Sequence, residues 1–398
     1  MAARRVLFLS SCVRGGGAGW SLYYLLKHLD RARIEPLVVV PDRGIFGERF
    51  DALDLEVLTP RWLPHRLLEQ RFSVHNHVTH YASAALNVGR MGLFVRQLAR
   101  LIQRERIDLV YCNNMMVKPL GALAAQLAGI PSVLHVRNIH ERPLPVAFYG
   151  SVARLPCVRR IIANSTASAV PYRAAAPDKV VVVHNGVDLD EYAPGGAGLA
   201  PAGEFRRRFE LGDATLVGFT GNLIPRKGVD TLVRAAAQVL RAHDDVVFVV
   251  LGRVPIGSPE DYAARYQALA AELGVADRVR FLGFVDDVRS AVADWDVLVL
   301  PSTQEPFGRS IIEAMALRTA VVASRVGGIP EIIDDGAHGL LVEPGNVPAL
   351  AEGIGALVGS PELRQRLTQA ARARIEEQFD VAKLTTRIES LLVDACTR

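Results

Sequence analysis

Four short stretches of the chain carry residue types that could bind or transfer a charged group. Three contain glycines together with cationic or acidic side chains, at 14–19, 221–228 and 305–313, and the fourth is the pair His135 and Arg137. Each stretch follows a run of apolar residues, as a loop follows a buried strand. Because loops at strand ends carry many functional groups of α/β proteins, these four stretches form the candidate site.

The glycine-rich stretch 14–19 opens a helix directly after the first apolar run. Glycines such as Gly16 and Gly17 let backbone N–H groups approach an anion at a helix N-terminus. The stretch is not a dinucleotide fingerprint, because G-x-G-x-x-G counted from Gly15 needs glycine where the chain has Trp20, and it lacks the Lys-Ser/Thr of a P-loop. An anion site and a plain tight turn both remain open.

Two adjacent cations, Arg226 and Lys227, lie in the loop 221–228. Pro225 and Gly228 shape this loop, and the cations come just before a predicted helix, where a diphosphate would bind favourably. The alternative is a solvated basic turn. The position directly after a strand favours the phosphate site.

Two carboxylates eight residues apart, Glu305 and Glu313, span a loop and the first turn of a predicted helix. One can lie at the strand end while the other faces ligand hydroxyls from the helix start. Ser310-x-x-Glu313 is also a capping box, in which Glu313 would only accept from the Ser310 backbone. In either case the amides of Gly308 and Arg309 would point at a phosphate.

His135 ends the apolar run 132–136, and Arg137 follows it. Side chains at the end of a parallel strand reach the ligand crevice, although a lone histidine is more often structural. His140 and His184 do not stand at metal-ligand spacing from His135. These histidines therefore do not predict a metal site.

Composition excludes a disordered chain, a collagen and a low-complexity protein. The 398 residues allow two or three domains, and 50% hydrophobic and 22% charged residues are average for soluble globular chains. No apolar run approaches the roughly 18 residues of a membrane-spanning helix. The four cysteines form no C-x-x-C pair, and the apolar start after Arg4 and Arg5 has no signal-peptide cleavage site. A cytoplasmic location is expected.

The net charge of +4 hides an asymmetry between the halves. Residues 1–195 hold 24 Lys and Arg against 15 Asp and Glu, a balance of +9, whereas residues 196–398 hold 22 against 27, a balance of −5. A basic half can attract an acidic substrate or the anionic inner face of a membrane. The segment 61–68 and the arginines of the helix ending near residue 106 are candidates for that contact. An ordinary wet, Arg-rich surface is the alternative. The arginines in question are Arg90, Arg96, Arg100 and Arg104.

Apolar runs alternate with amphipathic stretches along nearly the whole chain. Runs such as 108–112 and 246–251 predict strands, and stretches such as 118–128 and 229–243 predict helices. Continuous apolar strands alternating with helices indicate parallel sheets covered on both faces. The fold class is therefore α/β, with doubly wound sheets.

One stretch dense in Gly, Pro and Ala, 192–203, interrupts this alternation. It separates a first Rossmann-like domain, 1–190, from a second, 191–378, while 379–398 reads as a helix that packs back on the first domain. Two such domains would face each other across a cleft, which suits a reaction between two substrates with closure excluding water. A periplasmic-type binding protein shares this plan but would need an export signal.

Several motifs together make the chain similar to the retaining glycosyltransferases of family 4, which have the GT-B fold. The most specific is Glu305 to Glu313, which resembles the family's Glu-x7-Glu motif and is followed by Ala314-Met315-Ala316. The resemblance covers almost the whole chain. The other matching motifs are Gly15 to Gly17, His135, Asn164-Ser165, Asn185 to Asp188, Lys227-Gly228, Gly283 to Val285 and Gly327 to Glu331.

The resemblance implies a role for each matching residue. Glu313 would hold the nucleotide ribose, the main chain near Phe284 would read the base, and Glu305, Phe307 and Gly308 would contact the donor sugar. The diphosphate would contact Gly16, Gly17, Asn222, Arg226, Lys227, Gly308 and Arg309. His135 would lie beside the reacting carbon, with His135, Glu305 and Lys227 as the catalytic residues, and Arg137 would contact the acceptor.

The implied reaction moves a sugar from a nucleoside-diphosphate sugar to a hydroxyl acceptor, without a metal or other cofactor and by front-face attack. The acceptor could be a glycan, a lipid-linked saccharide or a small-molecule glycoside, and it could be acidic. No nucleic-acid partner is expected. Two residues depart from the family pattern: Asn222 stands where a second cation is usual, for which Arg226 could substitute, and Arg253 stands where an acidic residue or glycine is usual. A sugar-nucleotide 2-epimerase of the same fold and a non-catalytic nucleotide-sugar-binding subunit remain alternatives.

Overall fold

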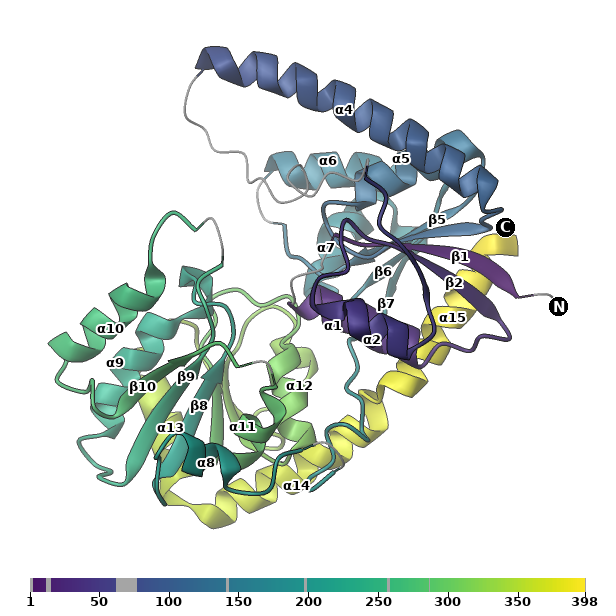
Figure 1. The fold of residues 1–398 in the computed structure, drawn as a ribbon. Coiled ribbons are helices and arrows are strands. Elements are labelled where there is room, and N and C mark those ends of the chain that lie inside the picture. The colour runs from purple at the N-terminus through teal and green to yellow at the C-terminus, as the bar shows by residue number, and fades with distance from the viewer. Residues whose placement is uncertain are drawn as a thin grey trace. The chain divides into compact units, whose positions relative to one another are not determined.

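The chain forms two compact units in the computed structural model of the protein (Figure 1). Unit 1 comprises Met1–Asn185 and Val381–Arg398, and unit 2 comprises Gly186–Asp380. The sequence placed the boundaries after residues 190 and 378, a few residues away. The structure describes residues 3–11, 16–61, 77–140, 143–196, 199–255, 258–285 and 287–397, with the backbone alone over 77–89.

Unit 1 contains a seven-stranded parallel sheet whose strand order is β3-β2-β1-β4-β5-β6-β7. The order reverses between β1 and β4, so loops that follow these two strands diverge there and leave room for a ligand. All strands coincide with apolar runs identified in the sequence. They are β1 (Arg4–Leu9), β2 (Ile34–Val39), β3 (Glu56–Leu58), β4 (Leu109–Cys112), β5 (Ser132–Val136), β6 (Val158–Ala163) and β7 (Val180–Val182).

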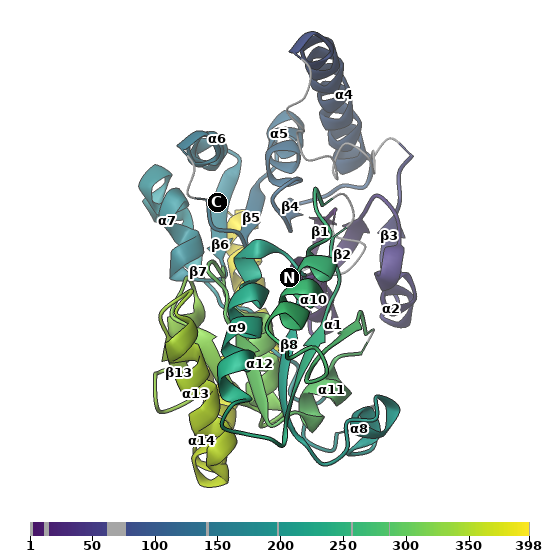
Figure 2. The ribbon, with the colours of Figure 1, turned by 90° about the vertical axis from the view of Figure 1, so that its left-hand side faces the viewer.

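Both faces of this sheet are buried, as continuous apolar strands predict. Leu7 and Leu9 belong to one hydrophobic core, and Val6 and Phe8 belong to another on the opposite face. The helix α15 contributes Ile388 and other side chains to the second core, and α4 lies beside α5 (Figures 1 and 2). The helices are α1 (Gly17–Lys27), α2 (Gly47–Ala52), α4 (His77–Arg104), α5 (Lys118–Ala128), α6 (Pro143–Arg154), α7 (Thr166–Ala175) and α15 (Val381–Thr397).

Unit 2 contains a six-stranded parallel sheet with the order β10-β9-β8-β11-β12-β13. Its order reverses between β8 and β11. The short strand β13 was not predicted from the sequence, whereas the other five were. The strands are β8 (Thr215–Thr220), β9 (Val246–Leu251), β10 (Val279–Gly283), β11 (Val297–Leu300), β12 (Ala320–Ser324) and β13 (Leu340–Val342).

Helices pack on this second sheet in the alternating pattern that the sequence predicted. The short α8 and the apolar α13 were not identified from the sequence. The helix predicted over 379–398 is α15, and it follows α14. Each unit is therefore doubly wound. The helices of unit 2 are α8 (Glu204–Arg208), α9 (Val229–Val239), α10 (Tyr262–Glu272), α11 (Arg289–Asp294), α12 (Arg309–Ala316), α13 (Val347–Gly359) and α14 (Pro361–Gln378).

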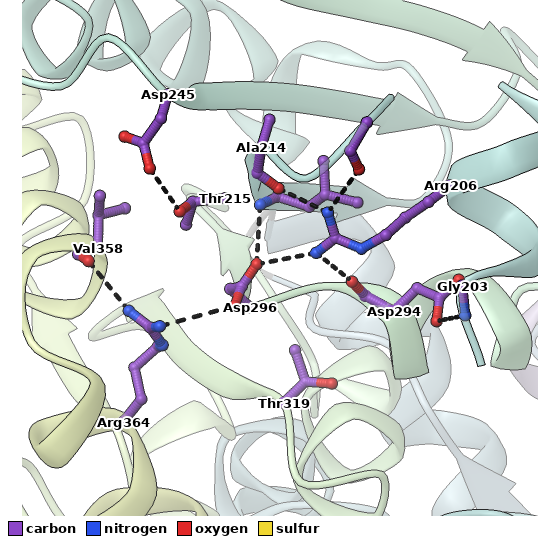
Figure 3. A network of polar contacts seen from close by, with 12 residues as sticks. Gly203, Arg206, Ala214, Thr215, Asp245, Asp294, Asp296, Thr319, Val358 and Arg364 are labelled. Atoms are coloured by element: carbon purple, nitrogen blue, oxygen red, sulfur yellow. Dashed lines mark hydrogen bonds and ion pairs between the residues drawn. The ribbon is translucent and has the colours of Figure 1, made fainter. Parts of the chain in front are cut away.

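The amino-terminal edge of the second sheet is held together by charges (Figure 3). Asp296, just before β11, pairs with Arg206 of α8 at 3.1 Å and with Arg364 of α14 at 3.7 Å, and accepts from the Leu216 amide. Arg5 has the same function in unit 1, where it pairs with Glu35 and with other acidic side chains. These ion pairs join neighbouring elements at the amino-terminal ends of the strands. Ligands of parallel sheets bind at the opposite, carboxyl-terminal ends.

Candidate active site

Two loops meet at the carboxyl ends of β8 and β11, where the strand order of unit 2 reverses. The amide of Thr303 donates to the carbonyl of Arg226 at 2.9 Å, and the Arg226 guanidinium donates to the carbonyl of Gln304 at 3.2 Å. On the other side of the 301–308 loop, the amide of Gly328 donates to the carbonyl of Glu305 at 3.1 Å. Backbone bonds from two neighbouring loops therefore hold Glu305 in place.

The close approach of these loops requires glycine at two positions. A Cβ on Gly228, whose φ is +69°, would lie 2.0 Å from the carbonyl oxygen of Pro301. A Cβ on Gly252, whose φ is +154°, would lie 1.8 Å from the carbonyl oxygen of Gly221. Both contacts are with backbone, which cannot rotate away as a side chain can. The glycines thus let the ends of β8, β9 and β11 lie against one another.

Lys227 and Glu305 form an ion pair across these two loops. Nζ of Lys227 lies 2.5 Å from Oε2 of Glu305, and the side chains are 15% and 10% exposed. The sequence predicted that both residues belong to one site, and the structure brings their charged groups into contact. A phosphate beside this pair could replace the carboxylate as the anionic partner of Lys227, so that the ammonium would keep a charge-assisted contact.

Glu313 does not form the capping box that its spacing from Ser310 allows. The helix α12 begins at Arg309 after Gly308, whose φ is +108°, and no side chain caps it. Glu313 instead accepts from Arg309 at 2.7 Å, one helical turn away. The capping-box alternative is therefore wrong, because the left-handed Gly308 precedes the helix and α12 begins two residues too early for Ser310 to be the cap. The amides of Arg309 and Ser310 lie in the first turn, which leaves its N–H groups without intrahelical partners.

Arg253 and Phe284 form a contact that the sequence did not reveal. The Arg253 guanidinium lies 4.4 Å from the centre of the Phe284 ring, a distance at which cation and ring attract. Phe284 is 53% exposed, which is unusual for a phenylalanine. The residue that departs from the family pattern thus contacts the residue expected to border the base.

Three further residues of unit 2 that were expected to contact the donor differ from one another in exposure. Asn222 and Arg226 are exposed at the surface of their loop. The ring of Phe307 is only 1% exposed and packs 6.0 Å from that of Phe379, so any contact of Phe307 with a sugar would come from its main chain. The roles given to these residues remain predictions.

In unit 1, the glycine stretch opens α1 next to β4. Gly16 has a φ of +92° and precedes α1, and the space where its Cβ would be is open. Asn113, directly after β4, donates to the carbonyl of Ala18 at 3.0 Å and to the hydroxyl of Ser10 at 3.1 Å. The amides of Gly17 and Ala18 are thus fixed at the end of β1. Residues 12–15 of this stretch lie outside the described part.

His135 lies at the end of β5, as predicted, and is 3% exposed. Its Nδ1 contacts the hydroxyl of Tyr111 and lies 3.0 Å from Nη2 of Arg137. Nη1 of Arg137 donates to the carbonyl and the side-chain oxygen of Asn113. Burial, followed by the charges of Arg137 and Lys118, lowers the pKa of His135 well below its usual value. His135 is therefore neutral at pH 7.

Lys118, at the start of α5, is a charged residue that sequence reasoning missed. It is fully buried, donates to the hydroxyl of Tyr172 at 3.2 Å and lies over the rings of Tyr149 and Tyr172. Burial lowers its pKa to about 7. A lysine at the start of a helix gives no sequence signal of burial, because such positions are usually exposed.

The described residues contain neither a metal-binding cluster nor a membrane-spanning helix. Within them, no group of three or more His, Cys, Asp or Glu side chains is arranged to hold a metal ion. No described helix is both long and apolar enough to cross a bilayer.

Solved structures share this architecture over nearly the whole chain. HepE from Anabaena, crystallised with UDP and glucose, is 26% identical with a TM-score of 0.80, covering 97% of this chain and 98% of HepE. WaaG, a glycosyltransferase involved in lipopolysaccharide biosynthesis, has the same fold at 17% identity and a TM-score of 0.69, covering 97% of this chain and 99% of WaaG. With its two parallel-sheet α/β units, the protein is of the GT-B class, as the sequence predicted.

Sequence relatives define the family more narrowly. The family model described as "Glycosyltransferase Family 4" matches residues 15–191, and that described as "Glycosyl transferases group 1" matches residues 203–374. The D-inositol 3-phosphate glycosyltransferase of Streptomyces coelicolor is 37% identical over 312 residues, 70% of this chain and 67% of that protein. For its counterpart in Streptomyces griseus, 37% identity covers 68% of this chain and 63% of the relative, less than two thirds of its length. The chain belongs to glycosyltransferase family 4.

Proposed function

We propose that the protein is a retaining glycosyltransferase that moves a sugar from a nucleoside-diphosphate sugar to a hydroxyl acceptor without a metal ion. The observation that carries this proposal is the ion pair of Lys227 and Glu305 beside the start of α12, where Arg309 pairs with Glu313. Cations, amides of a helix N-terminus and carboxylates together suit a ligand with both phosphates and sugar hydroxyls. The binding of UDP and glucose by HepE supports the same donor class.

In this proposal each charged group of unit 2 contacts one part of the donor. Lys227 leaves Glu305 partly or wholly and binds the diphosphate, with the amides of Gly308 and Arg309. Glu305 then accepts from sugar hydroxyls, and Glu313 accepts from the ribose hydroxyls. Stabilising the charge that develops on the leaving diphosphate is the main catalytic effect, because electrostatic stabilisation is usually the largest contribution to enzymatic rate.

Residues of unit 1 contact the reacting sugar and the acceptor in this proposal. His135 lies beside the reacting carbon of the sugar and contacts it, and an acceptor oxygen attacks from the face that the diphosphate leaves. The departing phosphate accepts the proton of the attacking hydroxyl, so no general base and no covalent intermediate on Glu305 are required. An acidic or lipid-linked acceptor agrees with the positive balance of the first half of the chain.

A transfer assay tests the proposal. Purified protein is incubated with UDP-glucose, and with GDP- and ADP-glucose in parallel, together with a panel of neutral, phosphorylated and lipid-linked saccharide acceptors. Release of nucleoside diphosphate that depends on an acceptor, with an α-linked product detected by mass spectrometry and NMR, is expected. Donor incubated alone provides the control, since a new nucleotide sugar in that sample would indicate the epimerase. Thermal shifts with donors but no turnover with any acceptor would favour a binding subunit.

We also propose that unit 1 contacts an anionic membrane. Large apolar side chains are exposed on α6, where Leu144 is 83% and Phe148 54% exposed, and the neighbouring α5 and α4 carry exposed Leu127 and Arg96. Apolar and cationic groups together favour an anionic interface. The segment 61–68, expected to take part, lies outside the described residues beyond Arg61. Flotation with anionic vesicles should be lost in Leu144→Ser/Phe148→Ser and kept in Ile45→Ser, a control at an exposed apolar position just before α2. Flotation of the double variant would contradict the assignment.

A further inference from the structure

The two ring nitrogens of His135 have different surroundings. Nδ1 lies 3.0 Å from Nη2 of Arg137 and contacts the hydroxyl of Tyr111, whereas Nε2 is buried without a hydrogen-bond partner among the described residues. A guanidinium can only donate hydrogen bonds, so Nδ1 of His135 must accept from Arg137. In a neutral imidazole this leaves the proton on Nε2.

We propose that Arg137 and Tyr111 are positioning residues that hold His135 as a neutral imidazole protonated on Nε2, so that His135 donates a hydrogen bond to a ligand oxygen and does not act as a base. The inference rests on the proposed transferase function and specifies how His135 serves it. It also changes the role of Arg137. The sequence assigned Arg137 to the acceptor, whereas here Arg137 acts through His135.

The network around Arg137 explains why it can hold the ring so firmly. Its Nη1 donates to both oxygens of Asn113, and Asn113 in turn donates to Ser10 and Ala18. These partners come from β1, α1 and the end of β4, so three elements fix the guanidinium. Arg137 itself is 8% exposed. A rigid fork aimed at Nδ1 selects one tautomer, as second-layer partners of histidine often do.

The charged groups that face His135 favour its neutral form. Arg137 follows β5, Lys118 comes from α5, and Tyr111 comes from β4; none of these is a carboxylate. No described Asp or Glu contributes to the lowered pKa of His135, which comes from burial and the two cations. A carboxylate beside Nδ1 would have stabilised an imidazolium. The described groups that shift the pKa of His135 include no carboxylate. His135 therefore has no such partner among them to stabilise the imidazolium that a proton-accepting histidine would become.

The buried Nε2–H group indicates the chemistry of the ligand atom. A buried donor without a partner is costly, and native proteins rarely leave one unpaired. The ligand atom must carry a lone pair, and the nearby Arg137 and Lys118 make an electron-rich oxygen the preferred acceptor. A hydroxyl oxygen of the donor sugar and a phosphoryl oxygen of the donor or the acceptor both satisfy this requirement.

The tautomer can be measured without any activity. Full-length protein is labelled with ¹⁵N-histidine, and its ring nitrogens are observed by long-range ¹H–¹⁵N correlation from about pH 6 to about pH 8, where an ordinary histidine titrates. His135→Gln identifies the His135 signal by its absence. We expect one protonated and one bare nitrogen, with the proton on Nε2, unchanged over this range. A proton on Nδ1, or titration to imidazolium within the range, would overturn the proposal whether or not the protein transfers sugar.

Two substitutions of His135 separate a donor from a base. The side-chain amide of Gln can place an N–H near the Nε2 position but cannot take up a proton, whereas Ala offers neither. We expect His135→Gln to keep turnover within about tenfold of the parent and His135→Ala to lose about a hundredfold or more. Equal loss in both variants, with both folded by circular dichroism, would contradict the donor role.

Arg137→Met tests the positioning residue. Without the guanidinium, neutral His135 can carry its proton on either nitrogen, so part of the population loses the Nε2 donor. We expect lower kcat that recovers partly as the pH falls, because imidazolium again carries a proton on Nε2. Phosphorylated and unphosphorylated acceptors, compared in both proteins, distinguish a phosphoryl from a hydroxyl oxygen as the partner. Loss of activity that deepens at lower pH would support a base and overturn the proposal.

Discussion

The carboxyl-terminal edges of the two sheets hold their charges in opposite ways. In unit 2 the cations of the site are paired with carboxylates, Lys227 with Glu305 and Arg309 with Glu313. In unit 1 the cations Lys118 and Arg137 are buried beside neutral partners such as Tyr172 and Asn113. Unit 2 thus presents cations and carboxylates that could each contact a ligand. Unit 1 presents hydrogen-bond donors held in place by neutral partners, and its cations disfavour protonation of His135.

Two sets of ion pairs within unit 2 show that an ion pair alone does not mark a functional site. Asp296 pairs with Arg206 and Arg364 at the amino-terminal edge of the same sheet (Figure 3), where ligands of parallel sheets do not bind. Its pairs tie helices to strands. The Lys227–Glu305 pair has similar chemistry but joins two strand-end loops beside a helix N-terminus, which is where ligands of parallel sheets bind.

Removing Lys227 should have the largest effect of the changes considered. We expect Lys227→Ala to lower kcat by about a hundredfold or more, since one charge-assisted contact to a developing charge contributes about 2 to 4 kcal/mol. Turnover with saturating donor measures the effect. Arg265→Ala, which removes an exposed pair with Glu260 on α10, provides the control and should leave turnover unchanged. Turnover near that of the parent in Lys227→Ala would show that the pair is structural, like that of Asp296.

The strands and many site positions could be predicted because buried parallel strands read as continuous apolar runs. The run 246–251 coincides with β9, whereas β13 has three residues, too few to show a pattern. The contact of Arg253 with Phe284 joins the ends of two different strands, and the start of α12 depends on the backbone angle of Gly308. Neither feature can be predicted from the spacing of residues along the sequence.

A larger side chain where the strand ends of unit 2 approach closely should have the next largest effect on stability and turnover. Gly228→Ala places a methyl group against the Pro301 carbonyl, and we expect a loss of about 2 to 3 kcal/mol of stability together with reduced turnover. Gly212→Ala is a matched control, because Gly212 also has a positive φ, +58°, but has open space at its Cβ. We expect it to cost only about 1 kcal/mol, measured by urea unfolding. Equal losses would mean that strain in φ, not loop contact, sets the requirement.

The buried lysine of unit 1 should make stability depend on pH. Lys118 has a pKa of about 7 in the folded protein and an ordinary value of 10.5. Between these values the unfolded chain binds more protons, so the contribution of Lys118 to stability rises with pH and is constant below about pH 7. We expect Lys118→Met to remove about 2 kcal/mol of this dependence between about pH 7 and about pH 8.5, as measured by urea unfolding. Lys383→Met, on an exposed position of α15, is the control, and an equal slope in parent and Lys118→Met would contradict a buried, destabilised ammonium.

Glu313 gives the finest test of the comparison, because its pair with Arg309 could serve the helix or the ligand. We expect Glu313→Gln to weaken UDP binding about tenfold, or about 1.4 kcal/mol, while the melting temperature stays the same, since an amide accepts more weakly from ribose hydroxyls than a carboxylate does. Glu376→Gln alters another pair four residues apart, with Arg372 on α14, and should change neither quantity. Calorimetry with UDP measures the affinity. A lowered melting temperature with unchanged affinity would assign the Arg309–Glu313 pair to the stability of α12, and the paired charges at this edge would then divide into one for the ligand and one for the fold.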